Sequence, residues 1–238
     1  MPRLLYLFAV AAFSLSFALP LRADTLPVPA NLIPFDSTEG EKLLVGAEAT
    51  KAYFALSEQF VTQQNQAFCG VASLVMVLNA LKVPAPASEE LAPFSAFDQS
   101  NIFTAQAEAV LPRTVIEENG MTLDQLGALA KAFGLKAAVR HASDTNLDAF
   151  RRDVRARLET AGQYVIVNYL RSALGQQKYG HISPLAAYDA DSDRFLILDV
   201  SRYKYPPVWV TASDLFAAMN TPDRDNDNRS RGFLEISR

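Results

Sequence analysis

The chain has 238 residues, half of them hydrophobic, and a formal net charge of −4 at pH 7. An excess of acidic residues argues against nucleic acid or an anionic lipid surface as the partner. Ten glycines, thirteen prolines and the absence of an internal repeat are typical of a globular protein rather than a fibrous or repeat protein.

The first 23 residues predict an export signal. Arg3 supplies a positive start, residues 4–21 are almost wholly apolar, and Ala23 is a small residue suited to cleavage. We expect residues 1–23 to be a signal peptide that is removed, with an uncleaved anchor as the alternative. Residues 24–238 are then expected to form a single domain in the bacterial periplasm.

The chain up to about residue 160 predicts mainly helices. Residues 24–34 contain three prolines and predict an extended lead-in. The elements that follow are a buried helix at 70–81, irregular structure with short helical turns at 89–112, a helix that begins at the capping box of Thr122 and Gln125 and ends at Gly134, a short strand at 136–142, and an amphipathic helix at 146–160.

The rest of the chain changes to alternating β-branched and aromatic residues, which predicts strands. The expected strands are 163–170, 181–188, 194–200, 208–211 and 232–236, with a short helix at 213–219. Turn-forming residues at 189–193 predict a hairpin between the second and third of these strands. Helices followed by an antiparallel sheet define an α+β fold.

Cys69 is the only cysteine, and it lies at the start of the predicted helix at 70–81. It cannot form an internal disulfide, so a free thiol in an exported chain calls for a chemical role. The positive end of a helix stabilises a thiolate, and its free N–H groups can bind an oxyanion. Cys69 is therefore a candidate nucleophile, with a small buried apolar residue as the alternative interpretation.

His181 and Asp199 are candidates for the base and the group that orients it. They lie ten and eight residues from Asp191 in the predicted turn, a mismatch that a β-bulge or an offset of the turn can absorb. The order Cys, His, Asp is that of papain-like enzymes, and Gln63 is placed to contribute an oxyanion-hole amide. The alternatives are a hydrogen-bonded core histidine, an aspartate that caps a turn and a surface glutamine.

Two further features are weaker candidates, one for the base and one for a calcium site. His141 is the only other histidine and the alternative base, but we expect no acid beside it in its apolar strand. Acids alternate along 223–228 as in a calcium loop, but Asn228 and Leu234 replace the required glycine and glutamate. We therefore expect a solvated acidic loop and no metal site in the protein.

Three segments, residues 63–73, 180–184 and 198–209, resemble the phytochelatin synthase family, most closely its short bacterial members. The resemblance implies a papain-like cysteine protease fold and cleavage of the Cys–Gly bond of glutathione. It also implies a γ-glutamylcysteinyl thioester on Cys69, with His181 as base and acid, Asp199 as its partner and Gln63 in the oxyanion hole. Water would accept the acyl group to give γ-glutamylcysteine, and a second glutathione would give phytochelatin.

The same resemblance suggests which residues bind the carboxylates of glutathione. The candidates are Arg231 first, then Asn168, Arg171 and Arg202. No cofactor is expected, because a single thiol does not make a soft-metal site, and a metal ion such as Cd or Zn would arrive as the glutathione thiolate. We expect hydrolysis to exceed transpeptidation, and a homodimer is in keeping with the family.

Two other functions remain open from the sequence. One is a general papain-like peptidase of the bacteriocin-processing kind, which shares the helix-borne cysteine and the distant His and Asp. The other is a catalytically silent exported protein that binds thiols or metals. Release of glycine from glutathione would distinguish the glutathione-cleaving enzyme from both of these alternatives.

Overall fold

The computed structural model describes residues 24–87 and 91–238. The predicted signal at 1–23 and the first two residues of the predicted irregular segment lie outside this part of the chain. The described residues form eight α-helices and an antiparallel sheet with the strand order β1-β6-β5-β4-β3-β7-β2, which confirms the α+β prediction. The strands are β1 Ile33–Pro34, β2 Lys136–His141, β3 Gln163–Leu170, β4 Gly180–Asp189, β5 Arg194–Ile197, β6 Val208–Thr211 and β7 Gly232–Ser237.

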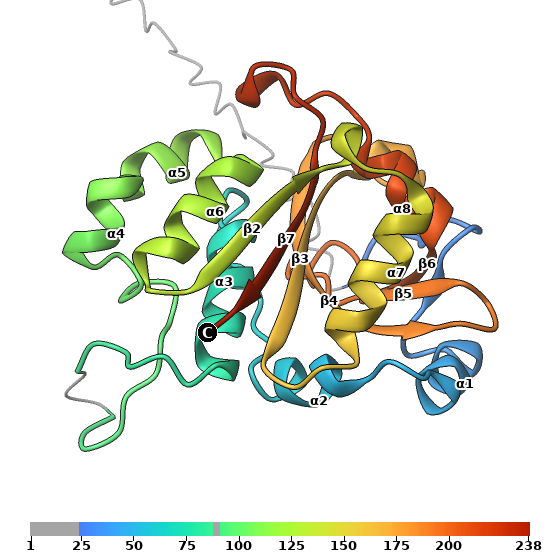
Figure 1. Cartoon of the computed structure of the whole chain (residues 1–238), viewed down its shortest axis with the longest axis horizontal. Helices are drawn as coiled ribbons and strands as arrows, with labels where there is room; N and C mark the ends of the chain where they lie inside the picture. Colours follow the sequence, from blue (N-terminus) through green and yellow to red (C-terminus); the bar gives the residue numbers. More distant parts are fainter. Residues whose placement is uncertain (1–23, 88–90) are drawn as a thin grey trace, which may run out of the picture.

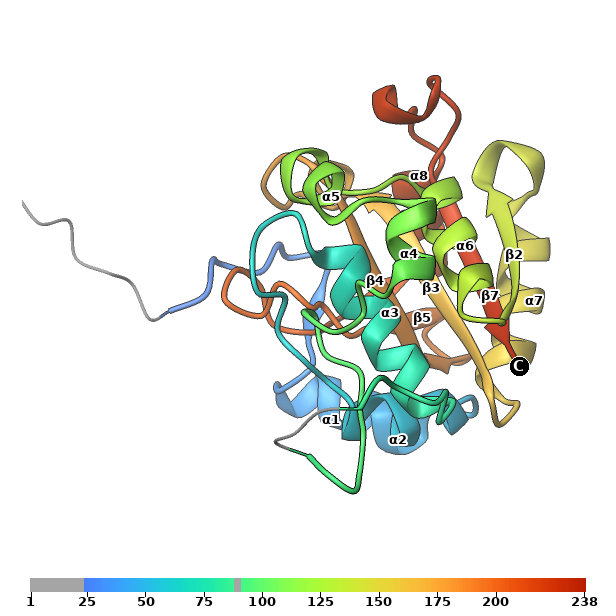
Figure 2. The same cartoon turned by 90° about the vertical axis from the view of Figure 1, so that its left-hand side faces the viewer.

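The helices cover the sheet from both sides. In Figure 1, α3 and α6 lie to one side of the strands while α7 and α8 lie to the other, and Figure 2 shows α4 and α5 outside α6. The helices are α1 Thr38–Gly46, α2 Lys51–Glu58, α3 Cys69–Ala80, α4 Ala105–Val110, α5 Arg113–Asn119, α6 Leu123–Ala132, α7 Leu147–Leu158 and α8 Ala212–Met219. Of the helices in the described ranges, none combines the length and the apolar character needed to cross a bilayer.

Helix α3 is buried all round, as its sequence predicts. It packs between α2, α6 and β4, and side chains on opposite faces, such as Leu74, Met76 and Leu78, are all fully buried. A helix that is apolar on every side is stable only where protein covers each side. Its position at the centre of the molecule fixes where its first residue, Cys69, can lie.

The predicted capping box at the start of α6 is present. The Thr122 side chain accepts the Gln125 N–H, and the Gln125 side chain accepts the Thr122 N–H. Helices α1, α2 and α5 were not predicted. A cap signal exists for α1, because Ser37 accepts the Gly40 N–H, but these helices have only 9, 8 and 7 residues and carry too short an apolar pattern to stand out.

The hairpin of β4 and β5 contains a bulge between Leu185 and Ala187, one of the two irregularities that could absorb the mismatch. In the register set by the Leu185–Ile197 pair, Asp199 lies opposite Ser183, whereas without the bulge it would lie opposite Pro184. Because side chains alternate between faces, this one-residue offset puts Asp199 on the same face as Ser183. The predicted strand at 194–200 is too long, since β5 ends at Ile197 and Asp199 lies in the segment that follows.

Candidate active site

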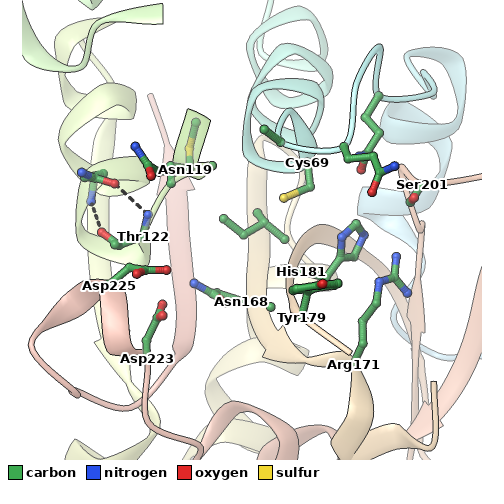
Figure 3. A pocket seen from close by; sticks show the side chains of 18 of the residues that line it. Cys69, Asn119, Thr122, Asn168, Arg171, Tyr179, His181, Ser201, Asp223 and Asp225 are labelled. Atoms are coloured by element: carbon green, nitrogen blue, oxygen red, sulfur yellow. Dashed lines mark hydrogen bonds between the residues drawn. The ribbon is translucent and has the colours of Figure 1, made fainter. Parts of the chain in front are cut away.

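Cys69 is the first residue of α3, and its thiol is partly exposed to a cavity. Phe68 precedes the helix and provides no side-chain cap, so the N–H groups of the first turn keep their hydrogen-bonding capacity. Ser73, one turn later, donates to both the Cys69 carbonyl (2.7 Å) and the Ile182 carbonyl of β4 (3.2 Å). The first turn of α3 is therefore held against β4 beside His181, as Figure 3 shows.

His181 is the second residue of β4 and is 4% exposed. Its Nε2 lies 2.9 Å from Asp199 Oδ1 and 2.9 Å from Ser183 Oγ. An ionised carboxylate can only accept a hydrogen bond, so Nε2 carries the hydrogen and the lone pair of Nδ1 is available to the thiol. Within the described part of the chain, Nδ1 makes no hydrogen bond of its own, as a base toward Cys69 requires.

Asp199 is fully buried and has a second charged partner, Arg171. The Arg171 Nη2 lies 2.8 Å from each carboxylate oxygen, and its Nη1 donates to Gln176 at 2.6 Å. Burial alone would oppose ionisation of Asp199, but His181 and Arg171 outweigh it and lower its pKa to about 2. The Ser201 N–H also bonds Oδ1, at 2.8 Å. Asp199 is thus held ionised and in one orientation at neutral pH.

Burial also decides the charge state of the other two groups. It lowers the pKa of His181 to about 4, with the positive charge of Arg171 acting in the same direction and Asp199 against it. It raises the pKa of the Cys69 thiol, against the effect of the Ile182 and Gly70 N–H groups. At neutral pH the resting pair is therefore a neutral thiol and a neutral imidazole, and proton transfer accompanies the attack of sulfur.

The low pKa of His181 makes folding stability depend on pH. The unfolded chain has the ordinary histidine pKa of 6.5 and the folded protein about 4, so the unfolded state binds more protons between these values. The free energy of unfolding should then fall by about 3 kcal/mol as pH drops from 6.5 to 4. Urea unfolding of the wild type and of His181→Gln at pH 7.5, 6 and 4.5 measures this loss. Equal losses in the two proteins would show that another group is responsible.

Gln63 lines the same cavity as Cys69. Its backbone N–H donates to the Val200 carbonyl at 2.8 Å, which ties it to the segment after Asp199. Its side-chain Nε2 donates to the Asn65 carbonyl (2.7 Å) and to the Tyr203 hydroxyl (3.1 Å), while Oε1 is buried without a partner. The amide therefore lines the same cavity as Cys69, but both of its hydrogens already have acceptors.

The cavity has a volume of about 700 Å³ and carries both signs of charge. Its cations are Arg171, Lys178, Lys204 and Arg231, and its acids are Glu117, Glu118, Asp223 and Asp225. Figure 3 shows Asp223 and Asp225 across from Cys69 and His181, with Asn168 between the two groups. Within the described residues, no group of three or more His, Cys, Asp or Glu side chains is arranged to hold a metal ion.

Two of the residues expected to bind the carboxylates line the cavity and have hydrogen-bond donors without a partner among the described residues. Asn168, on β3, makes no side-chain hydrogen bond within the described ranges, and Arg231 has a buried Nε without a partner. The other nitrogens of Arg231 bind Thr221, Pro222 and Asp223. A β-carbon on Gly180 would lie only 3.2 Å from this Nε, so the glycine keeps the approach to Arg231 open.

The other two are placed differently. Arg171 lines the cavity, and two of its N–H groups bind Asp199 and Gln176, so it also holds the orienting carboxylate. Arg202 is exposed, lies over the Phe60 ring at 4.5 Å, and is not among the residues that line the cavity. Neighbouring sequence positions could not reveal that Arg171 would bind Asp199 and Gln176.

His141 was expected to have no acid nearby, and this was wrong. Its Nε2 lies 3.2 Å from Asp124, and its Nδ1 contacts the Ser230 carbonyl. The Asp124 contact comes from a different element, α6, and so was not visible from the strand sequence. His141 does not line the cavity.

Sequence reasoning missed Ser183, which contacts the catalytic candidate His181 directly. Ser183 is fully buried, and its Oγ also accepts the Val200 N–H at 3.3 Å. The two residues are separated by one position in a strand, so their side chains share a face. That spacing was a usable signal. Tyr169, opposite His181 on β3, packs against its ring edge-to-face at 5.7 Å and needed the strand register to be found.

The fold and this site define a papain-like α+β protein, with a cysteine at a helix start facing a histidine–aspartate pair on a sheet. A sequence model of the phytochelatin synthase family matches residues 23–233. The chain belongs to the phytochelatin synthase family, as the sequence motifs predicted.

Curated relatives support the assignment over nearly the whole chain. Glutathione gamma-glutamylcysteinyltransferase 1 of Lotus japonicus is 37% identical over 216 residues, covering 90% of this chain and 42% of the relative. The Arabidopsis thaliana protein of the same name is 36% identical over 218 residues, covering 90% and 43%. The glutathione gamma-glutamylcysteinyltransferase of Schizosaccharomyces pombe is 31% identical over 210 residues, covering 87% and 49%. The chain thus spans less than half the length of these relatives.

Proposed function

We propose that this protein cleaves the Cys–Gly bond of glutathione and holds the γ-glutamylcysteinyl group as a thioester on Cys69. The observation that carries the proposal is that Cys69, at the start of α3, and His181 line one cavity, while buried Asp199 bonds His181. Relatives that align over 87–90% of the chain are named glutathione gamma-glutamylcysteinyltransferases, which supports the same chemistry.

In the first half of the reaction, His181 Nδ1 takes the thiol proton as Cys69 Sγ attacks the carbonyl carbon of the cysteinyl residue. The oxyanion that forms faces the free N–H groups at the start of α3, and the Gln63 amide reaches it by exchanging the Tyr203 hydroxyl for the oxyanion. Collapse of this intermediate breaks the C–N bond. The glycine amine leaves with the proton from His181, and the thioester remains.

In the second half, the acceptor is water or the amine of a second glutathione. His181 removes its proton as it attacks the thioester, and returns a proton to Cys69 as the thiol leaves. The products are γ-glutamylcysteine or a γ-glutamylcysteinyl dimer of the phytochelatin type. We propose that hydrolysis is the faster route. A yield of γ-glutamylcysteinyl oligomers above that of free γ-glutamylcysteine would overturn this order.

The charges that line the cavity suit a zwitterionic tripeptide. Glutathione carries two carboxylates and one ammonium group, and the cavity offers cations and acids within one volume. The unpartnered Nε of Arg231 and the free amide of Asn168 are donors for a carboxylate. Asp223, which already bonds Arg231 at 3.2 Å, and Asp225 are acceptors for the ammonium group.

We further propose that the protein needs no resident metal and that a metal ion enters as a glutathione thiolate, because Cys69 is the only thiol in the chain. We also propose that the protein is exported to the periplasm and that it forms a homodimer. The export part rests on the composition of residues 1–23 alone.

The test is incubation of the purified protein, under reductant, with glutathione, with Cys-Gly and with an unrelated peptide. We expect glycine from glutathione alone and a mass increase on Cys69 that corresponds to one γ-glutamylcysteinyl group. Cleavage of the unrelated peptide at a comparable rate would indicate a general peptidase. Failure to release glycine from glutathione would refute the proposed function.

A further inference from the structure

The segment that carries Gln63 is held by the side chain of Gln99, which lies 36 positions further along the chain. Gln99 Oε1 accepts the Gln64 N–H at 2.9 Å, and Gln99 Nε2 donates to the Thr62 carbonyl at 2.8 Å. The amide thus bonds the backbone on both sides of Gln63, as a neighbouring strand would. Gln99 is 5% exposed, so these two bonds are not in competition with bulk water.

A second amide of the same kind connects the Gln99 segment to α3. Asn79, near the end of α3, accepts the Phe97 N–H at 2.8 Å and donates to the Phe97 carbonyl at 2.9 Å. Two residues later, Gln99 binds residues 62 and 64. The helix that begins with Cys69 and the segment that carries Gln63 are therefore linked through two side-chain amides in series. Figure 2 shows the segments before α3 and before α4 running beside each other.

Gln63 has contacts of its own on the other side. Its backbone N–H bonds the Val200 carbonyl at 2.8 Å, and its side-chain amide bonds the Asn65 carbonyl and the hydroxyl of Tyr203, a residue that is 48% exposed. An oxyanion has to replace Tyr203 as the acceptor of that amide hydrogen. During this exchange, Gln99 keeps the backbone of residues 62 and 64 in place, so the Gln63 side chain alone has to adjust.

We propose that Gln99 is a positioning residue that acts through Gln63, by fixing the oxyanion-hole amide relative to the nucleophile helix. The inference rests on the proposed function, because it assigns Gln99 to the same transition state. Loss of Gln99 leaves the thiol, His181 and Asp199 untouched, since none of them contacts it. Its effect should therefore fall on kcat and leave the KM for glutathione within about twofold.

A double-mutant cycle tests the proposal. Gln99→Ala should lower kcat about tenfold in the wild-type background, which corresponds to about 1.4 kcal/mol. In a Gln63→Ala background the same change should lower kcat less than twofold, because the amide it positions is gone. Gln99→Met, which keeps the side-chain length without the amide, repeats the test should the alanine variant fold poorly. An equal loss in both backgrounds would overturn the proposal.

Amide hydrogen exchange gives a second readout that does not depend on activity. The Gln64 N–H should exchange at least about tenfold faster in Gln99→Met than in the wild type, because its acceptor is removed. Asn146→Ala is the matched control, since it removes an amide that caps α7 through the Ala149 N–H, far from Gln63. It should leave kcat and Gln64 exchange unchanged. If Gln64 exchange is unchanged in Gln99→Met, Gln99 does not hold the backbone beside Gln63, and the positioning role is refuted. An inactive wild type would instead refute the proposed function.

Discussion

Replacing Cys69 with serine lowers glycine release from glutathione by at least about 10³-fold. Serine matches cysteine in shape, but its hydroxyl is far more difficult to deprotonate and is a weaker nucleophile toward an acyl group. The His181 base, whose pKa is about 4, can assist a thiol but gains little driving force for removing a hydroxyl proton. Glycine analysis over hours, together with intact-mass measurement, tests the expectation.

The same variant should keep the fold. Cys69 is partly exposed, and Ser73, not Cys69, makes the bonds that hold the first turn of α3 against β4. Its thermal midpoint should lie within a few degrees of the wild-type midpoint. A γ-glutamylcysteinyl adduct on Cys69→Ser, or retention of more than about 1% of the rate in a folded variant, would contradict the assigned nucleophile.

Replacing Asp199 with asparagine should lower kcat by about 10³–10⁴-fold and destabilise the fold as well. The catalytic loss arises because a neutral amide no longer favours the His181 tautomer with its proton on Nε2. The stability loss arises because Arg171, which is 3% exposed, keeps its charge without a counter-ion. Removing one partner of a buried ion pair costs about 3–5 kcal/mol. Glycine release and urea unfolding measure the two effects.

A second substitution separates these two causes. Asp199→Asn combined with Arg171→Met removes the unbalanced charge, so the double variant should recover most of the lost stability. It should not recover activity, because the histidine still lacks its carboxylate. A double variant no more stable than Asp199→Asn would show that the charge of Arg171 is not the source of the destabilisation.

Arg171→Met alone tests the effect of the Arg171 charge on the pKa of His181. The positive charge of Arg171 contributes to the low pKa of that histidine. Without it the pKa rises, so the acid side of the pH–rate profile should move to higher pH, toward the ordinary 6.5. If the pH–rate profile does not move, the charge of Arg171 does not influence the pKa of His181.

Elements with a long pattern or a specific cap were predictable from the sequence. The apolar residues of α3, the capping box of α6 and the β-branched and aromatic residues of β3, β4 and β7 each reflect local backbone chemistry. Short helices such as α2 and α5 were missed because eight or seven residues give too few turns for a periodic signal. Their formation depends on the surfaces against which they pack.

The candidate site shows the same division. Cys69, His181 and Asp199 became candidates from residue type, spacing and resemblance. The mismatch of ten against eight residues in the hairpin left a bulge or a turn offset open, and the structure has a bulge. The amide of Gln99 could not be assigned to Gln63, because the two are joined by hydrogen bonds between segments 36 positions apart. No local pattern encodes such a contact.

The sequence by itself determined which groups can react: one thiol at a helix start, a histidine in a strand and a carboxylate near the end of the next. Their types, order and local backbone follow from chemistry within a few residues. Only the tertiary structure decided their charge states and the occupation of their donors, because desolvation and hydrogen bonding depend on every group nearby. That is why the bond between Arg171 and Asp199 could not be read from the sequence, and why the resting thiol and imidazole are neutral.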